Sequence, residues 1–298
     1  MPQLSSVKRR EAKMHKEEKI SELAELLKTL NCKEADRIND LVKSILDSAD
    51  DKTTFFGKAF FDKTSDRNIM FQAEQLDIHN VKSRVLLLEF EINIKEQTFE
   101  ILNSIVSSRM GQNYIVPIVN NKYAIVYDID SEDDASEFSL AMSESMINEF
   151  GAVLNVGVGG EYKEIADCKR SYEEAEMALN AGKKILGDSI VYEYDNIAIA
   201  KLIFDLSQSE SERFLKEVFN EESLKELENR EMLESLNTFF KCDLNLSVAA
   251  RELYIHRNTL VYRIEKFNKA SGYNLCKFED AVIVKIALLF RRKMNDKI

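Results

Sequence analysis

The sequence predicts a multidomain α+β protein, with helices at the N-terminus, an α/β sandwich in the centre and an all-helical domain at the C-terminus. Apolar residues recur at helical spacing near both ends, whereas strand patterns lie between residues 84 and 194. Nine glycines and two prolines among 298 residues are few, which indicates many helices and no long flexible linkers. The 45% hydrophobic and 31% charged content is typical of a globular protein, and the length suffices for two or three domains.

Residues 1–68 are predicted to form a helical segment. Apolar residues between positions 20 and 30 recur at spacings of three, four and three, as in a coiled-coil seam, although a helix packed on its own chain would show the same pattern. These residues are Ile20, Leu23, Leu27 and Leu30. A second helical pattern follows at 34–48, and residues 50–54 are interpreted as a loop. The next segment is expected in the core or at a domain-packing surface because it contains Phe55, Phe56, Phe60 and Phe61.

The centre of the chain, residues 69–205, is predicted to be one domain in which strands alternate with helices. Leucine, phenylalanine and isoleucine occupy every second position of 84–94, which predicts a strand with one buried face. Asn120, Asn121 and Lys122 predict a hairpin turn, because asparagine tolerates positive φ. The predicted elements are helix 69–76, strand 84–94, helix 96–110, strands 114–119 and 123–128, helix 132–150, strand 153–159, helix 163–181 and strand 189–194.

Residues 206–298 are predicted to form the helical domain. Its last helix, 280–292, has apolar residues on nearly every side and must therefore be buried. The stretch 245–267 has the layout of two short helices joined by a tight break. In the first of these, Ser247 is interpreted as the N-cap, and a small apolar inner face lets a second helix cross closely. That inner face consists of Ala249, Ala250 and Leu253.

The break is expected at residues 254–256, and the second helix near Arg257, with His256 or Asn258 as its N-cap. One buried stripe along this helix is predicted from the spacing of Leu260, Ile264 and Phe267. This is the layout of a DNA-binding helix-turn-helix, whose second helix places its N-terminal residues against base edges. On spacing alone, an ordinary pair of surface helices with solvated basic residues remains the alternative.

Charge is distributed unevenly along the chain. Residues 241–298 hold 12 Lys and Arg against 6 Asp and Glu, a net charge of +6, whereas the preceding 240 residues hold 29 against 46, a net charge of −17. A basic module on an acidic body suits a protein that meets DNA at one end only.

Specific motifs lie in the C-terminal stretch: Ala249-Ala250-Arg-Glu-Leu253, His256-Arg-Asn-Thr-Leu260, Tyr262-Arg263 and Ser271-Gly272. They resemble the C-terminal domain of the PucR/CdaR family of bacterial transcription regulators, which is itself similar to the helix-turn-helix of Fis. The resemblance implies that the second helix binds double-stranded DNA. The implied contact residues are His256, Arg257, Asn258, Thr259, Val261, Tyr262, Arg263 and Lys266.

Arg257 is the expected base contact, because a guanidinium binds guanine through two hydrogen bonds in the major groove. Val261 stands where the family commonly has a basic residue, so the surface is expected to be less cationic, and Val261 is expected to contact a thymine methyl group if it faces DNA. The residues expected to hold phosphates or to flank the base contact are Thr259, Tyr262, Arg263 and Lys266.

Two further motifs, Val156-Gly-Val-Gly159 and Ser171-Tyr-Glu-Glu-Ala175, lie in the central domain. Together with the element order they resemble the degenerate GGDEF-like domain, of ferredoxin-like α/β fold, that precedes the helix-turn-helix in CdaR-type regulators. The two resemblances cover roughly residues 70–292. The family's usual N-terminal ligand-sensing domain is not apparent in residues 1–68. The resemblance implies a small-molecule effector, but the sequence does not indicate which molecule it is.

Catalytic and metal-binding patterns are missing from the sequence. The hairpin Val119–Tyr123 lacks the glycines and the acidic pair of a diguanylate cyclase, and Glu89 and Glu91 are interpreted as surface residues of a strand. The glycines at 157–160 match no phosphate-binding loop and are interpreted as easing a strand-to-helix turn. Four cysteines and three histidines are too scattered to indicate a zinc site or disulfide framework. We therefore expect no enzymatic activity, no metal and no cofactor.

The sequence thus predicts a DNA-binding transcription regulator of metabolic genes, active as a homodimer or higher homo-oligomer. The alternative is a ligand- or nucleotide-binding signalling protein whose C-terminal domain binds protein. No secretory signal follows the first residues, and the longest apolar run, Ala281–Phe290, is too short to span a membrane, so a cytoplasmic location away from membranes is expected.

Overall fold

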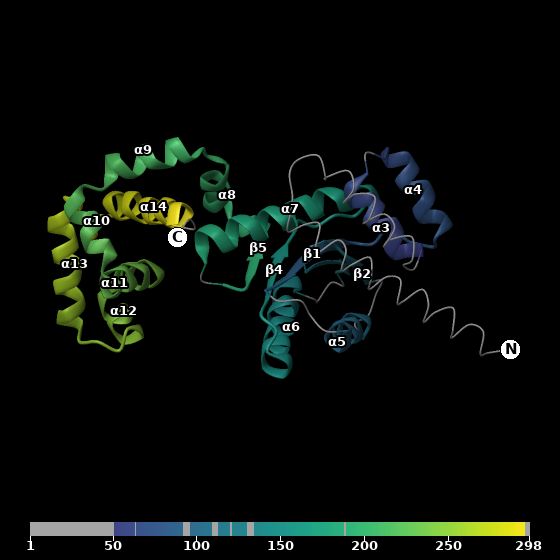
Figure 1. Cartoon of the computed structure of the whole chain (residues 1–298), viewed down its shortest axis with the longest axis horizontal. Helices are drawn as coiled ribbons and strands as arrows, with labels where there is room; N and C mark the ends of the chain where they lie inside the picture. The colour runs from purple at the N-terminus through teal and green to yellow at the C-terminus, as the bar shows by residue number, and fades with distance from the viewer. Residues whose placement is uncertain are drawn as a thin grey trace, which may run out of the picture. The chain divides into compact units, whose positions relative to one another are not determined.

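The computed structural model describes residues 51–62, 64–91, 96–108, 113–119, 121–129, 134–187 and 189–295 (Figure 1). The predicted coiled coil and the helix at 34–48 lie outside these residues. The chain divides into two compact units. The first runs to Lys183 and includes Asp188–Ala198, and the second consists of Lys184–Gly187 and Ile199–Ile298. The predicted domain border at residues 205 and 206 falls inside the second unit.

The first unit confirms the predicted α+β class and its order of strands and helices. Its elements are α3 (Asp51–Phe61), α4 (Asp66–Gln75), β1 (Ser83–Phe90), α5 (Glu96–Ser107), β2 (Tyr114–Pro117), β3 (Lys122–Asp128), α6 (Ala135–Phe150), β4 (Leu154–Val158), α7 (Cys168–Ala181) and β5 (Val191–Glu193). The strands form one sheet in the order β2-β3-β1-β4-β5, which is antiparallel except for the parallel pair β4–β5.

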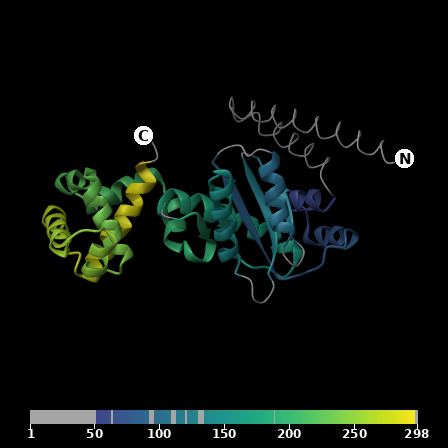
Figure 2. The ribbon, with the colours of Figure 1, turned by 90° about the horizontal axis from the view of Figure 1, so that it is seen from below.

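Helices cover both faces of this sheet (Figures 1 and 2). Leu86, Leu88 and Phe90 of β1 point to the face of α5 and α6, where they join one buried cluster, so the predicted alternation is confirmed. Val85 and Leu87 on the opposite face are also buried, under α7. Both faces of β1 are thus covered between Arg84, near the start of the strand, and Glu89, near its end.

The loop expected at residues 50–54 is wrong, because α3 begins at Asp51. Tertiary packing explains the helix: Phe56 lies against Tyr114 of β2, with ring centroids 5.0 Å apart. Phe60 stacks on Tyr172 of α7 at 4.8 Å. Phe55 is buried as well, which confirms the predicted core role of this segment, while Phe61 is half exposed.

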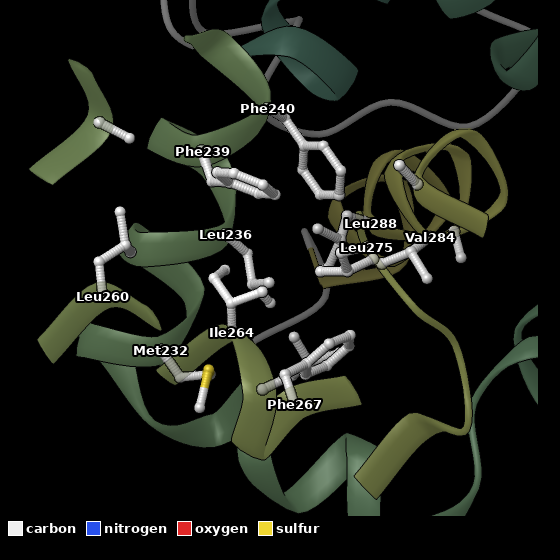
Figure 3. Close-up of a cluster of buried hydrophobic side chains, with 14 of the residues drawn as sticks. Met232, Leu236, Phe239, Phe240, Leu260, Ile264, Phe267, Leu275, Val284 and Leu288 are labelled. Atoms are coloured by element: carbon white, nitrogen blue, oxygen red, sulfur yellow. The ribbon is translucent and has the colours of Figure 1, made fainter. Parts of the chain in front are cut away.

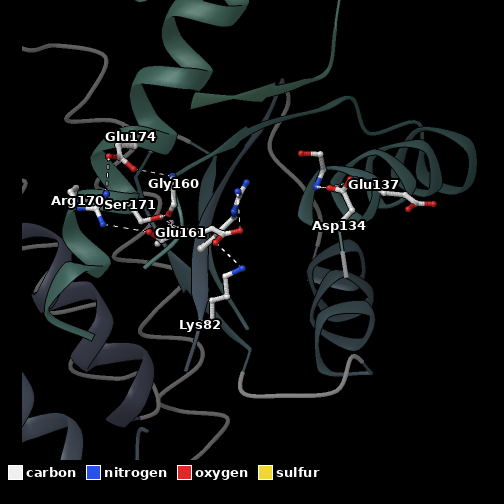
Figure 4. A network of polar contacts seen from close by, with 11 residues as sticks. Lys82, Asp134, Glu137, Gly160, Glu161, Arg170, Ser171 and Glu174 are labelled. Atoms are coloured by element: carbon white, nitrogen blue, oxygen red, sulfur yellow. Dashed lines mark hydrogen bonds and ion pairs between the residues drawn. The ribbon is translucent and has the colours of Figure 1, made fainter. Parts of the chain in front are cut away.

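Gly157 of β4 and Gly159, which follows the strand, have a role that the sequence interpretation missed. Neither Gly157 nor Gly159 has a positive φ angle, so a tight turn is not the reason for glycine at these positions. Instead, α7 crosses so close that a Cβ atom on Gly159 would lie 2.0 Å from the carbonyl oxygen of Ser171. The Oγ of Ser171 fixes this approach, because it accepts a hydrogen bond from the Val85 amide (2.9 Å) and donates one to the Gly160 carbonyl (2.7 Å) (Figure 4).

The second unit is a helical bundle around one hydrophobic cluster (Figure 3). Its helices are α8 (Ala198–Asp205), α9 (Gln208–Val218), α10 (Glu221–Glu228), α11 (Arg230–Lys241), α12 (Leu246–Glu252), α13 (Arg257–Ser271) and α14 (Phe278–Asn295). Val284 and Leu288 of α14 are buried in this cluster, whereas Val282 is 36% exposed, so the expected burial of the last helix is confirmed for one side only. No helix among the described residues is long and apolar enough to cross a bilayer.

Candidate nucleic-acid interface

The helices α12 and α13 form the predicted helix-turn-helix, with one correction at its start. The N-cap of α12 is Asn245, whose Oδ1 accepts hydrogen bonds from the amides of Ser247 (3.0 Å) and Val248 (3.2 Å). The predicted cap, Ser247, therefore lies inside the first turn. Asparagine and serine are similarly good N-caps, and Asn245, which lies two residues earlier, caps the helix. The predicted apolar inner face is confirmed for Ala249 and Ala250, which are buried.

The second helix begins where the sequence indicates. His256 is its N-cap, and its Nδ1 atom accepts a hydrogen bond from the amide of Asn258 at 3.2 Å. Because Nδ1 accepts this bond, the ring N–H that can donate is on Nε2, and His256 is exposed. The predicted buried stripe is confirmed, because α13 contributes to the core cluster through Leu260, Ile264 and Phe267.

The first turn of α13 presents its polar side chains to solvent. Arg257, Asn258 and Thr259 are exposed. One turn further, Val261 is half-buried, whereas the side chain of Tyr262 is 65% exposed. Leu260 and Ile264 anchor the helix in the core further along the chain, so these exposed side chains stand on a rigid support. We call Arg257, Asn258, Thr259 and Tyr262 the outer face of α13.

Arg263 and Lys266, by contrast, are engaged with acidic residues of neighbouring helices. The guanidinium of Arg263 donates to Ser235 Oγ (3.0 Å) and pairs with the Glu231 carboxylate on α11, and its side chain is only 20% exposed. The Lys266 ammonium lies 2.7 Å from the Glu226 carboxylate of α10, and this hydrogen bond raises the pKa of Lys266. Sequence reasoning missed both contacts, since no local pattern links α13 to α10 or α11.

The hairpin of the first unit has a polar cluster at the end of the sheet. Asn121 has a φ angle of 58°, which confirms the predicted asparagine turn. Glu89 pairs with Lys122 directly across the β1–β3 ladder (3.6 Å) and with Lys183. Its carboxylate is thus neutralised by two lysines, while Glu91 lies exposed beyond the end of β1. Within the described residues, no group of three or more His, Cys, Asp or Glu side chains could hold a metal ion.

Both units match known families. Residues 232–290 match the PucR C-terminal helix-turn-helix domain, and residues 62–181 match the GGDEF-like domain. A solved structure, a regulator of polyketide synthase expression from Bifidobacterium adolescentis, aligns at 16% identity with a TM-score of 0.39, covering 86% of this chain and 99% of that one.

Curated relatives include the purine catabolism regulatory protein of Bacillus subtilis, 24% identical over 147 residues (49% of this chain, 28% of that protein). The proline-responsive transcriptional activator PutR of the same organism is 22% identical over 207 residues (66% and 50%). The carbohydrate diacid regulator of Escherichia coli is 25% identical over 147 residues (48% and 37%). The matches thus span half or less of the length of these relatives. The domain pair, GGDEF-like followed by PucR C-terminal helix-turn-helix, identifies the chain as a protein of PucR/CdaR type.

Proposed function

We propose that this protein is a sequence-specific DNA-binding regulator of transcription that controls metabolic genes. The observation that carries the proposal is the outer face of α13. Its first turn exposes Arg257, Asn258 and Thr259, while the helix is held in the core by Leu260, Ile264 and Phe267. A rigidly supported helix whose N-terminal side chains are exposed is the form in which a helix-turn-helix reads base edges. The names of the relatives, which concern purine, proline and carbohydrate diacid regulation, support metabolic genes as targets.

Each exposed side chain has a contact that its chemistry favours. Arg257 reads guanine, and Asn258 reads adenine, because each can form two hydrogen bonds to that base in the major groove. Thr259, Tyr262 and the Nε2–H of His256 donate to phosphates, which position the helix without specifying sequence. Val261 contributes an apolar contact to a thymine methyl group. Arg263 and Lys266 contribute less than their charge implies, because Glu231 and Glu226 already neutralise them.

The active species is proposed to be at least a dimer in the cytoplasm. One recognition helix covers too few base pairs to select a genomic site, and two half-sites about 34–36 Å apart require two such helices. A small-molecule effector is proposed to control binding.

We infer no cyclase activity, since the hairpin of Asn121 and Lys122 lacks the required glycines and acidic pair. GTP turnover with magnesium that is lost in Glu89→Ala would contradict this inference.

The test starts from genomic DNA, because the operator is not known. Fragments retained by the full-length protein define a site, and binding isotherms on that duplex and on a random duplex are then measured across salt concentrations. We expect tighter binding to the selected duplex, and a linear fall of log affinity with log salt on both. Sedimentation of the free protein and of the complex measures the oligomeric state. A monomer in both would contradict the dimer, and no retention of DNA at any salt concentration would favour a protein-binding domain.

A further inference from the structure

Tyr254, in the turn between α12 and α13, has an unfavourable backbone conformation. Its φ angle is +54°, in the left-handed region that residues with a Cβ atom rarely adopt. Turns of this motif often contain glycine, which has no such penalty. The side chain does not offset this cost by packing against the fold, since it is 96% exposed. For stability alone, a glycine would therefore be the better residue at this position.

The other residues with positive φ have an explanation that Tyr254 lacks. Three of them are aspartate or asparagine, which tolerate this region: Asp77, Asn121 and Asp243. Leu244 is bulky, but its half-buried side chain packs against the hydrophobic cluster of the second unit. Within the described part of the chain, Tyr254 is the only large side chain that combines positive φ with nearly complete exposure. Strained residues that persist without a structural reason are concentrated at functional sites.

The position of Tyr254 indicates that its side chain contacts DNA. Two hydrogen bonds fix the turn to the end of α12, because the Tyr254 amide donates to the Arg251 carbonyl (3.0 Å) and the Ile255 amide to the Ala250 carbonyl (3.0 Å). Ile255 packs on the core and His256 caps α13, so the tyrosine ring projects from the turn just before the outer face of α13. When the start of α13 lies in the major groove, a residue beside it faces the sugar–phosphate edge of that groove.

We propose that Tyr254 is a DNA-backbone contact, whose phenol hydroxyl donates to a phosphate oxygen while its ring lies against the adjoining deoxyribose. This inference rests on the proposed function. A neutral hydroxyl releases no counterion, so the contact adds affinity without adding salt dependence, which distinguishes it from a contact by lysine or arginine. Because phosphates carry no sequence information, the contact strengthens binding to specific and random duplexes alike.

Two variants separate stability from binding. Tyr254→Gly relieves the backbone strain and removes the ring, so we expect a higher melting temperature together with weaker binding to both duplexes. Tyr254→Phe keeps the strain and removes only the hydroxyl. It should leave the melting temperature unchanged and lower affinity about 3- to 10-fold on both duplexes, with the same salt slope as the wild type. The matched control is Phe278→Ala, which removes a 71% exposed aromatic ring at the start of α14 and should leave DNA binding unchanged.

The outcomes distinguish this inference from the proposed function. If the wild type does not bind DNA, the proposed function fails. If Arg257→Ala weakens binding while both Tyr254 variants bind as the wild type does, only the tyrosine contact fails. A lower melting temperature of Tyr254→Gly would show that the tyrosine supports the fold, and would overturn the inference as well. An equal loss of affinity in Phe278→Ala would overturn it too, because exposed aromatic rings in general would then matter.

Discussion

Arg257→Ala is expected to lower affinity for the selected site about 5- to 150-fold, with little change on random DNA, because a good base contact contributes about 1–3 kcal/mol of discrimination. Arg257 lies in the first turn of α13, and its side chain is exposed. Within the described residues its guanidinium forms no ion pair or hydrogen bond that the fold would lose. The melting temperature should therefore stay unchanged, and only the ratio of specific to random binding should fall.

Arg263→Ala is the matched control, since it removes the same charge from the same helix. Its guanidinium contacts Ser235 and Glu231 of α11, so the variant should lose about 1 kcal/mol of stability, limited by the exposure of Glu231. Any loss of DNA affinity should be similar on both duplexes. The measurement is a set of isotherms on both duplexes across salt, together with thermal melts. Equal loss on the two duplexes for Arg257→Ala, at unchanged stability, would remove Arg257 from base reading.

The comparison of Arg257 with Arg263 also shows which parts of the site were predictable. The buried stripe and the start of α13 depend on residues within one or two helical turns, so the local sequence located the stripe and narrowed the N-cap to His256 or Asn258. The engagement of Arg263 and Lys266 depends on Glu231 and Glu226, which belong to separate helices brought close by the bundle. A basic residue on the polar side of a helix looks the same in sequence whether or not a carboxylate lies opposite it.

The same distinction holds for the first unit. The alternation of β1 and the asparagine hairpin are local patterns, and both were predicted correctly. The start of α3 was missed because its phenylalanines are held by Tyr114 and Tyr172, which follow much later in the chain. Tertiary packing there overrides a loop-like run of aspartate and threonine. The role of Gly157 and Gly159 was missed for the same reason, since it depends on where α7 crosses the sheet.

Gly157→Ala is expected to destabilise the first unit by about 3 kcal/mol or more. A Cβ atom at this position would lie 2.1 Å from the Ala175 carbonyl oxygen and 2.8 Å from Leu179 Cβ. Both atoms belong to α7, so relief requires the whole helix to move away from the sheet. Such a movement would also stretch the hydrogen bonds by which Ser171 joins α7 to Val85 and Gly160. Overpacking against a fixed backbone costs more than the addition of one methyl group to a cavity.

Gly160→Ala is the matched control, in the residues that directly follow β4. Its Cβ atom would lie 2.4 Å from Glu174 Oε2, which is the far end of a flexible side chain and can rotate away. Gly160→Ala should lower the free energy of unfolding by only about 1 kcal/mol, mainly because the hydrogen bond from the Gly160 amide to Glu174 is lost. Urea unfolding of the full-length variants, with hydrogen exchange of the β1 and β4 amides, measures both effects in the unit concerned. Equal protection of these amides in the two variants would contradict this expectation. A methyl group against a backbone oxygen would then destabilise the sheet no more than one against a mobile carboxylate.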